Sequence, residues 1–227
     1  MLLTVLSYPN SSFKLLNMIC KVNKYIIIFP RPLKSFFKLW QAVVERYFKL
    51  LCLNINSMAN MTMERLKILK VFLEALRKSI DFKFNVNSFD HRLKLQKLVY
   101  IAKSLGVPKL EYDFNLYLRG PYSPELADDY YNLVESVGIC EDEVETLLSN
   151  EAFRKFAELV NGKDGLWLEI AATLIELKKV VDDLVRRELA KGDKDELLIN
   201  LTINRKPFAR REYVGEVLDK LKLHKAI

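Results

Sequence analysis

Apolar residues recur at helical spacing through most of this chain, and residues that end helices separate the runs. In residues 64–79, leucines and a phenylalanine recur every three or four positions, which places them on one face of a helix. Most of the runs end at glycine, asparagine or proline, which commonly terminate helices. The predicted helices span residues 64–79, 90–105, 124–137, 142–148, 151–160, 164–191, 195–203 and 209–223.

One segment departs from the helical pattern. Residues 112–118 alternate aromatic residues with others at a period of two, which is typical of a strand. Gly120 and Pro121 then predict a turn of the chain. Ser123 followed by Pro124 predicts the N-cap and the first position of the next helix.

These patterns together predict a mainly α fold, a compact multi-helix domain with one short strand or a small β-hairpin near residues 112–119. Asp90, Asn150 and Asp164 each precede a helical run and are predicted N-caps. Residues 195–203 contain β-branched residues, which also suit a strand, but their pattern fits a buried helix better.

The first 60 residues differ from the rest of the chain. The formal net charge is +7, and all of the excess lies in residues 1–60, because residues 61–227 contain 28 basic and 28 acidic residues. Residues 1–60 also lack glycine and are rich in residues with A/T-rich codons. We therefore divide the chain into an N-terminal extension, residues 1–60, and a helical domain, residues 61–227.

Two interpretations of the extension are open. Met58, Met61 and Met63 lie just before the first predicted helix, so one of them is a candidate start of translation, and the preceding segment would then be an artefact of gene assignment. Alternatively, the extension is genuine, and residues 33–53 form a basic amphipathic helix that lies on a membrane surface. A membrane is a predicted partner only in this second interpretation.

The sequence lacks the residue patterns of common enzyme sites. Its three cysteines, Cys20, Cys52 and Cys140, are far apart, and neither of its two histidines, His91 and His224, has a cysteine nearby in sequence. The seven glycines are not clustered, so the sequence contains no phosphate-binding loop. We therefore predict that the protein is not an enzyme and has no catalytic residues, no metal and no cofactor.

Two other features of the composition have plain explanations. The acidic run at residues 141–145 lacks the spacing and the glycine of a calcium-binding loop, and it predicts a solvated helix N-terminus. The chain has only two glutamines but abundant lysine and glutamate, a bias that leans towards a thermophilic protein.

The segment around the predicted turn is the strongest candidate for a functional site. Tyr117, Arg119, Tyr122 and Ser123 are predicted to form a rigid aromatic and cationic patch at the tip of a loop. Tyrosine and arginine are common anchors of protein interfaces. A purely structural interpretation also accounts for this segment, since it needs only a turn, a cap and a helix start, and the two interpretations are compatible.

Two motifs resemble a known family. Residues 93–100 read Leu-Lys-Leu-Gln-Lys-Leu-Val-Tyr, and residues 120–126 read Gly-Pro-Tyr-Ser-Pro-Glu-Leu. Together with the aromatic strand between them, they resemble the Panacea domain, the SocA-like antitoxin-associated family, and its uncharacterised archaeal and bacterial relatives. The resemblance extends over roughly residues 64–223. The positions to which it assigns structural roles are Leu95, Gln96, Lys97, Tyr100, Gly120, Pro121 and Pro124.

The resemblance implies a mostly helical protein without catalytic residues. We therefore expect a cytoplasmic, non-catalytic protein-interaction module, antitoxin-like or regulatory, whose partner is another protein, such as a toxin encoded nearby. Gln96 and Lys97 are expected to brace the turn beyond the strand. The sequence does not indicate an oligomeric state.

The alternative function is a winged-helix-type DNA-binding transcriptional regulator. Short helices, the predicted hairpin and the basic pairs at residues 205–206 and 210–211 motivate it. The zero net charge of residues 61–227 argues against nucleic acid as a partner, because contacts to phosphates supply most of the non-specific affinity for nucleic acid.

Overall fold

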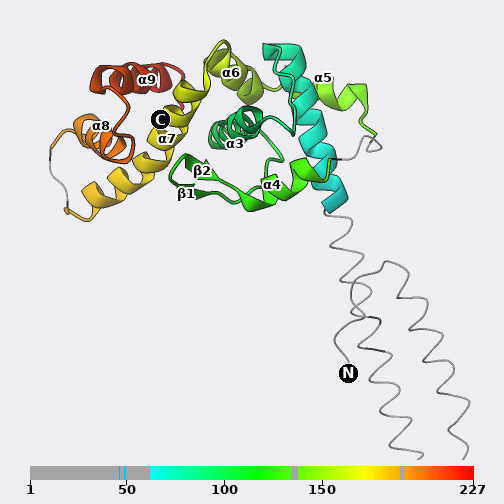
Figure 1. Cartoon of the computed structure of the whole chain (residues 1–227), viewed down its shortest axis with the longest axis horizontal. Coiled ribbons are helices and arrows are strands. Elements are labelled where there is room, and N and C mark those ends of the chain that lie inside the picture. The colour runs from blue at the N-terminus through cyan, green and yellow to red at the C-terminus, as the bar shows by residue number, and fades with distance from the viewer. Residues whose placement is uncertain (1–45, 47–48, 50–61, 134–137, 190–191) are drawn as a thin grey trace, which may run out of the picture. The chain divides into compact units, whose positions relative to one another are not determined.

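The structure is a computed structural model. The chain divides into two compact units, residues 1–59 and residues 60–227, and all of the elements labelled in Figure 1 belong to the second unit. Met58 and Met61 lie outside the described residues, and so does the predicted helix over residues 33–53 apart from two positions. The described residues are 46, 49, 62–133, 138–189 and 192–227.

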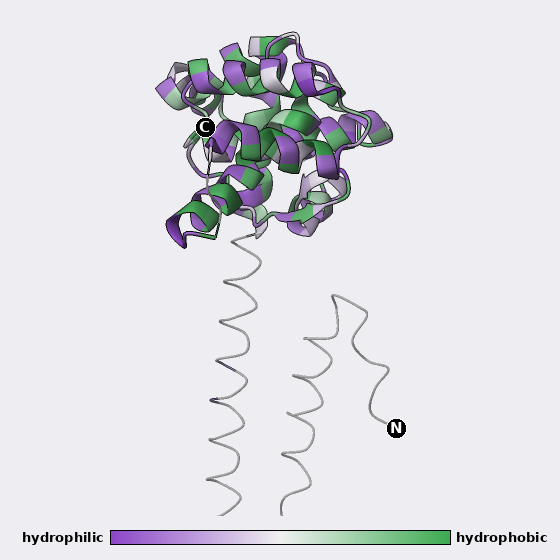
Figure 2. Cartoon of the chain, turned by 90° about the vertical axis from the view of Figure 1, so that its left-hand side faces the viewer, coloured by the Kyte–Doolittle hydropathy of each residue, from purple (hydrophilic) through white to green (hydrophobic). Residues whose placement is uncertain are grey.

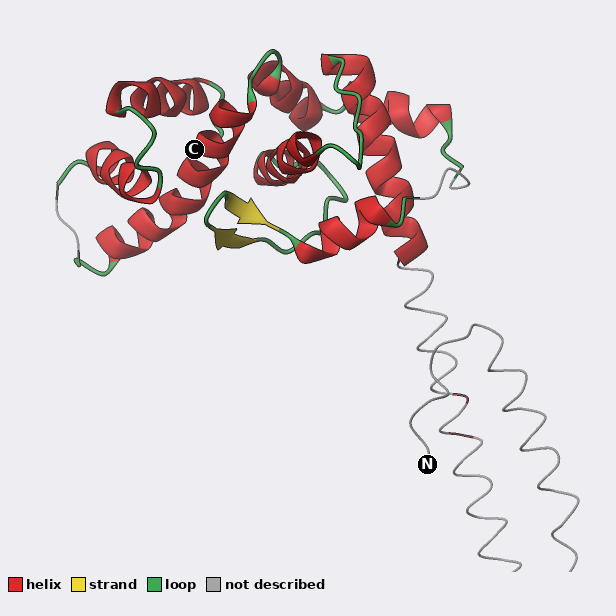
Figure 3. Cartoon of the chain, viewed as in Figure 1, coloured by secondary structure: helices red, strands yellow, loops and turns green. Residues whose placement is uncertain are grey.

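Helices dominate the described part of the second unit, and a small β-hairpin interrupts them (Figures 1 and 3). The first helix covers residues 62–80. The hairpin consists of two antiparallel strands, β1 (Asn115–Tyr117) and β2 (Gly120–Tyr122). The predicted fold class, mainly α with one small hairpin, is confirmed. The other helices are α3 (Phe89–Ser104), α4 (Pro124–Tyr131), α5 (Glu141–Ser149), α6 (Glu151–Val160), α7 (Gly165–Arg186), α8 (Lys194–Arg205) and α9 (Arg211–Leu223).

Helices α3 and α7 pack against each other and organise this unit. Helices α8 and α9 pack against α7, while α6 packs against α3 and α5 (Figure 1). Strand β2 lies against both α3 and α7, so the hairpin is supported by the two central helices. Figure 2 shows that hydrophilic and hydrophobic residues alternate along the helices, as expected where each helix buries one face.

Three phenylalanines form a cluster within the core. The ring of Phe72, from the helix over residues 62–80, lies 6.1 Å from the ring of Phe153 and 5.8 Å from that of Phe156, measured between ring centroids. All three side chains are buried. Aromatic rings at these separations contribute both buried apolar area and favourable ring contacts, so the cluster ties α6 to the first helix.

Most of the predicted helix starts are confirmed, but one is wrong. Helix α3 begins earlier than predicted: Ser88 is its N-cap, and the hydroxyl accepts a hydrogen bond from the His91 N–H at 3.3 Å. Asp90 instead lies in the first turn, where its carboxylate pairs with Lys94 at 2.8 Å. Three predicted N-caps do accept hydrogen bonds from the backbone of the helices that they precede, namely Ser123, Asn150 and Asp164.

Two helices are shorter than their apolar patterns predict. Asn132 ends α4 directly after Tyr131. Helix α7 ends at Arg186, because Glu188 adopts a left-handed conformation with φ of 59° and the next N–H bonds back to the carbonyl of Leu184 at 2.9 Å. Glycine is the usual residue in that conformation, so a glutamate there gives no signal in the sequence. The ambiguous segment at residues 195–203 is helical, within α8.

The phenylalanine cluster makes a stability prediction. We expect Phe156→Ala to lower the free energy of unfolding by about 3–5 kcal/mol, because the change removes buried apolar area and leaves a cavity. Phe208→Ala is the matched control, since Phe208 is 62% exposed, and it is expected to change the free energy by less than about 0.5 kcal/mol. Urea unfolding followed by circular dichroism measures both, and equal losses would contradict the assignment of the core.

Candidate functional site

The hairpin turns over two residues, Leu118 and Arg119. Tyr117 and Gly120 pair across this loop, so Gly120 and Pro121 belong to β2, and the prediction that they form the turn is wrong. Gly120 has a φ of 84°, which completes the tight reversal of the chain. A Cβ atom at Gly120 would also lie 3.2 Å from the Thr173 hydroxyl oxygen, so glycine is needed for both conformation and space.

A glutamine on α3 holds the end of the hairpin. The Gln96 side-chain amide donates to the Ser123 carbonyl at 2.9 Å, and its oxygen accepts from the Ser123 N–H at 2.9 Å. The Ser123 hydroxyl accepts from the Leu126 N–H at 3.3 Å and caps α4. Ser123 is fully buried, so the prediction that it presents a contact surface to a partner is wrong.

Two buried lysines hold the loop from beneath. The Lys97 ammonium donates to the Pro121 carbonyl at 2.6 Å, and the Lys206 ammonium donates to the Leu118 carbonyl at 2.6 Å. Lys206 also pairs with Glu169 on α7, and both lysine side chains are almost fully buried. Gln96 and Lys97 therefore brace the hairpin as expected, while Lys206 adds a third support from the connection between α8 and α9.

The buried setting changes the acid–base behaviour of Lys97. Burial disfavours the charged ammonium and lowers the pKa of Lys97 to about 8. The carboxylate of Glu169 opposes this shift, and the second ammonium on Lys206 adds to it. The geometry gives Lys97 a positioning role, because its ammonium is directed at a backbone carbonyl of the hairpin.

The opposite side of the loop faces solvent. Tyr117 is 53% exposed, Leu118 is 87% exposed, and Arg119 is exposed as well. Tyr122 is only half-buried, and its ring meets that of Tyr117 edge to face at 5.6 Å between centroids. The loop thus combines a fixed backbone with large side chains that extend outwards.

Aromatic rings and guanidinium groups alternate beside this loop. The Arg119 guanidinium lies 5.2 Å from the centroid of the Phe89 ring, and the Arg92 guanidinium lies 5.6 Å from the same centroid. Arg92 also lies 5.8 Å from the ring centroid of Tyr131 on α4. Such cation–π contacts favour these arginine positions by about 0.5–1 kcal/mol each at exposed sites. We call this set the hairpin surface. It consists of the partly buried Arg92 and five exposed residues, Phe89, Tyr117, Leu118, Arg119 and Tyr131.

Sequence reasoning finds only part of the hairpin surface. Tyr117 and Arg119 are among its predicted residues, whereas Phe89, Arg92 and Tyr131 come from two helices that the fold brings to the loop. The fold alone identifies Arg92 and Tyr131, because their role depends on the contact between α3 and α4.

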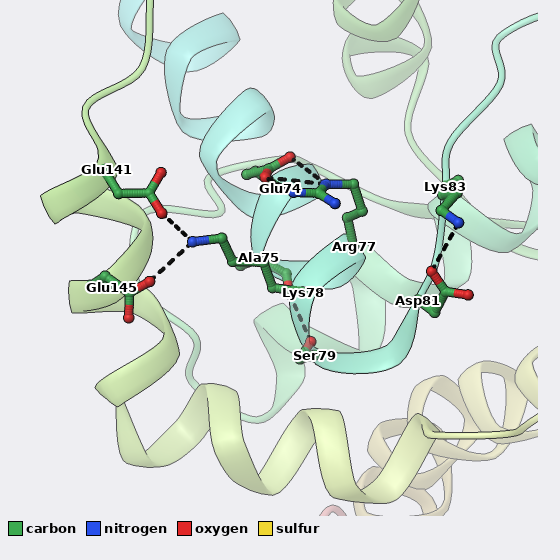
Figure 4. Close-up of polar contacts among 9 residues, drawn as sticks. All are labelled: Glu74, Ala75, Arg77, Lys78, Ser79, Asp81, Lys83, Glu141 and Glu145. Atoms are coloured by element: carbon green, nitrogen blue, oxygen red, sulfur yellow. Dashed lines mark hydrogen bonds and ion pairs between the residues drawn. The ribbon is translucent and has the colours of Figure 1, made fainter.

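The acidic run at the start of α5 is engaged with lysines of the first helix. The Lys78 ammonium contacts the carboxylates of Glu141 and Glu145, the latter at 3.0 Å (Figure 4). Glu143 pairs with Lys67 at 2.7 Å. Over the described residues, no group of three or more histidine, cysteine, aspartate or glutamate side chains is arranged to hold a metal ion. These carboxylates connect α5 to the first helix.

The other residues considered for chemistry have structural surroundings. The His91 Nδ1 accepts a hydrogen bond from the Asn85 N–H at 3.1 Å, and its ring lies 5.6 Å from that of Phe82. Cys140 is exposed and precedes α5. Among the described residues, neither His91 nor Cys140 forms a hydrogen-bonded pair of a nucleophile and a base. The hairpin surface is therefore the stronger functional candidate.

No protein-family model matches the chain, and a search of curated proteins finds no match to it. Among the helices that the structure describes, none has the length and apolar character needed to cross a membrane.

The requirement for Gly120 can be tested with a second glycine as control. Gly106 also has a positive φ, of 82°, but a Cβ there meets no atom within 4 Å. We expect Gly106→Ala to cost about 1–2 kcal/mol for conformation alone. Gly120→Ala is expected to cost about 1 kcal/mol more, because Thr173 must also move. Equal losses in urea unfolding would mean that the space around Gly120 is not limiting.

The burial of Lys97 predicts that the free energy of unfolding depends on pH. Since the pKa of Lys97 falls from 10.5 to about 8 on folding, the unfolded chain binds more protons than the folded protein between these values. The free energy of unfolding therefore rises with pH across this window, and keeping Lys97 charged costs stability below pH 8. We expect the rise to be on the order of 1–3 kcal/mol larger in the wild type than in Lys97→Met. Parallel pH profiles of urea unfolding would contradict it.

Proposed function

We propose that this protein is a non-catalytic interaction module that binds a partner protein through the hairpin surface. The observation that carries the proposal is the row of exposed aromatic rings and guanidinium groups beside a loop that is fixed from beneath. Tyrosine, arginine and other large side chains supply most of the binding energy at protein interfaces. Phe89, Tyr117 and Tyr131 are each more than half exposed, so this energy is available to a partner.

The fixed loop supports a binding role in a second way. Ordering flexible segments and side chains at an interface costs free energy and weakens binding. Here the carbonyls of Leu118 and Pro121 are already held by buried lysines, and Arg92 and Arg119 already rest on aromatic rings. A partner would therefore bind a surface that requires little further ordering.

The resemblance to the Panacea family also supports this proposal. The motif residues Gln96 and Lys97 lie directly under the hairpin, and Gly120 and Pro121 form its second strand. The motifs thus serve to position the loop, which is what a family of binding modules would share. We propose an antitoxin-like or regulatory role, with a toxin encoded nearby as the first candidate partner.

The winged-helix alternative has less support from the geometry. Of the basic residues that motivate it, Lys206 is buried against Glu169, and Arg211 pairs with Glu196 and donates to the Asn200 side chain at 2.7 Å. These two cations are already engaged within the protein, whereas Arg205 and Arg210 are exposed. Contacts with a phosphate backbone require cations that are accessible and not already paired.

Loss of the exposed loop side chains is expected to weaken partner binding. We expect the double variant Tyr117→Ala, Leu118→Ser to bind the purified partner at least tenfold more weakly than the wild type, because it removes two interface anchors without touching the buried supports. The matched control is Leu223→Ser, since Leu223 is 71% exposed at the end of α9. Isothermal titration calorimetry with the full chain measures the affinities.

The partner for this experiment comes from the products of neighbouring genes and from proteins retained by the immobilised full chain in an extract of its source organism. Each candidate is purified and tested for direct binding. A toxin partner would also stop growth in a test host unless the chain is co-expressed. Partners that bind the double variant as tightly as the wild type would contradict the proposed surface, and no direct binding by any candidate would contradict the proposed function.

A further inference from the structure

Arg92 and Arg119 have no carboxylate partner among the described residues, although they lie in a protein rich in ion pairs. Lys94, on the same helix as Arg92, pairs with Asp90 at 2.8 Å. In contrast, the guanidinium groups of the two arginines lie over aromatic rings, and Arg92 also donates a hydrogen bond to the Val86 carbonyl at 2.6 Å. A guanidinium that rests on a ring still has donors along its edge, and two of them can bind one carboxylate.

Both arginines are held before any partner arrives. Arg92 contacts the rings of Phe89 and Tyr131 and bonds to a backbone carbonyl, which restricts its rotamer. Arg119 lies on the two-residue loop whose backbone Lys206 fixes from beneath, and its guanidinium rests on Phe89. Because little side-chain entropy remains to be lost, an ion pair with a partner would be stronger here than at a flexible surface arginine.

The spacing of the two arginines limits the shape of the partner. Their guanidinium groups lie 5.6 and 5.2 Å from the centroid of the same Phe89 ring. The two central carbons are therefore at most about 11 Å apart, the length of about three residues of an extended chain. Two acidic side chains two positions apart in an extended segment lie on the same face of the segment and fit within this limit. Leu118 and Tyr117 offer apolar contacts beside them.

The surrounding charge favours a protein segment over nucleic acid. Helix α4 contributes Tyr131 and also exposes Asp128, three positions earlier on the same helix. A single-stranded nucleic acid would stack on the aromatic rings, but it carries a negative charge at every nucleotide, and the Asp128 carboxylate and the zero net charge of residues 61–227 oppose it. Two discrete carboxylates need only the two arginines.

We infer that the partner presents an extended acidic segment to the hairpin surface, with two carboxylates that pair with Arg92 and Arg119 and an adjoining apolar side chain that covers Leu118. This inference rests on the proposed function and names the chemistry of the partner. The segment contains two aspartate or glutamate residues, two positions apart.

A random peptide library tests this inference without knowledge of the partner. Nine-residue peptides displayed on phage are selected on the immobilised full chain, after depletion on the double variant Arg92→Gln, Arg119→Gln. We expect the enriched peptides to contain two acidic residues at the stated spacing and an apolar neighbour. Circular dichroism and urea unfolding check that each variant is folded.

The enriched peptide, synthesised with a fluorescent label, then measures the contribution of each arginine. We expect Arg92→Gln and Arg119→Gln each to weaken binding at least tenfold, and Arg92→Lys to recover only part of the loss, because lysine lacks the planar pair of donors. Arg154→Gln, an exposed arginine on α6, is the matched control and should bind as the wild type does. Replacing one peptide glutamate with glutamine should remove the effect of one arginine substitution.

Three results would overturn the inference. Enriched peptides that are neutral or basic, or a loss in Arg154→Gln equal to that in Arg92→Gln, would exclude carboxylate pairing at these sites. Binding of a labelled twenty-nucleotide oligothymidine that both arginine variants abolish would assign the surface to nucleic acid.

The same peptides separate the inference from the proposed function. If neutral peptides still depend on Tyr117 and Leu118, the inference fails and the proposed binding function stands. If no enriched peptide depends on the hairpin surface, both fail.

Discussion

The hydrogen bonds of two buried lysines to the hairpin backbone are the interaction on which the hairpin and its exposed surface depend. Placing an ammonium inside a protein costs free energy unless it is paired and hydrogen-bonded. Lys206 meets this condition through Glu169 and the Leu118 carbonyl, and Lys97 does so through the Pro121 carbonyl. Among the described residues no buried side-chain nitrogen or oxygen lacks a hydrogen-bond partner, so the arrangement is complete.

These bonds bring distant parts of the chain together beneath a single loop. Gln96 and Lys97 come from α3, Glu169 and Thr173 from α7, and Lys206 from the connection between α8 and α9. The hairpin therefore takes its position only when these elements have packed. Two strands of three residues each would not be stable alone in water, because so short a hairpin buries too little apolar area.

The division between buried and exposed side chains in the loop follows from this support. The Leu118 carbonyl faces Lys206, while the side chains of Tyr117, Leu118 and Arg119 are exposed. The exposed Phe89 and the partly buried Arg92 extend this surface along α3. The backbone carbonyls of the loop thus contribute to its stability, while its side chains are available to bind a partner. The loop can therefore be rigid and still present a large apolar and cationic surface.

By itself, the sequence determined the helices, the hairpin and most of the caps, because periodicity and capping depend on residues close along the chain. Only the tertiary structure decided where Ser123 and Lys206 lie. Ser123 is buried although Pro124 beside it is exposed, and Lys206 is buried although it belongs to a basic run. It also decided that Arg92 joins Arg119 over one aromatic ring. The physical reason is that burial and ring contacts depend on packing between elements far apart in sequence, which local patterns do not encode.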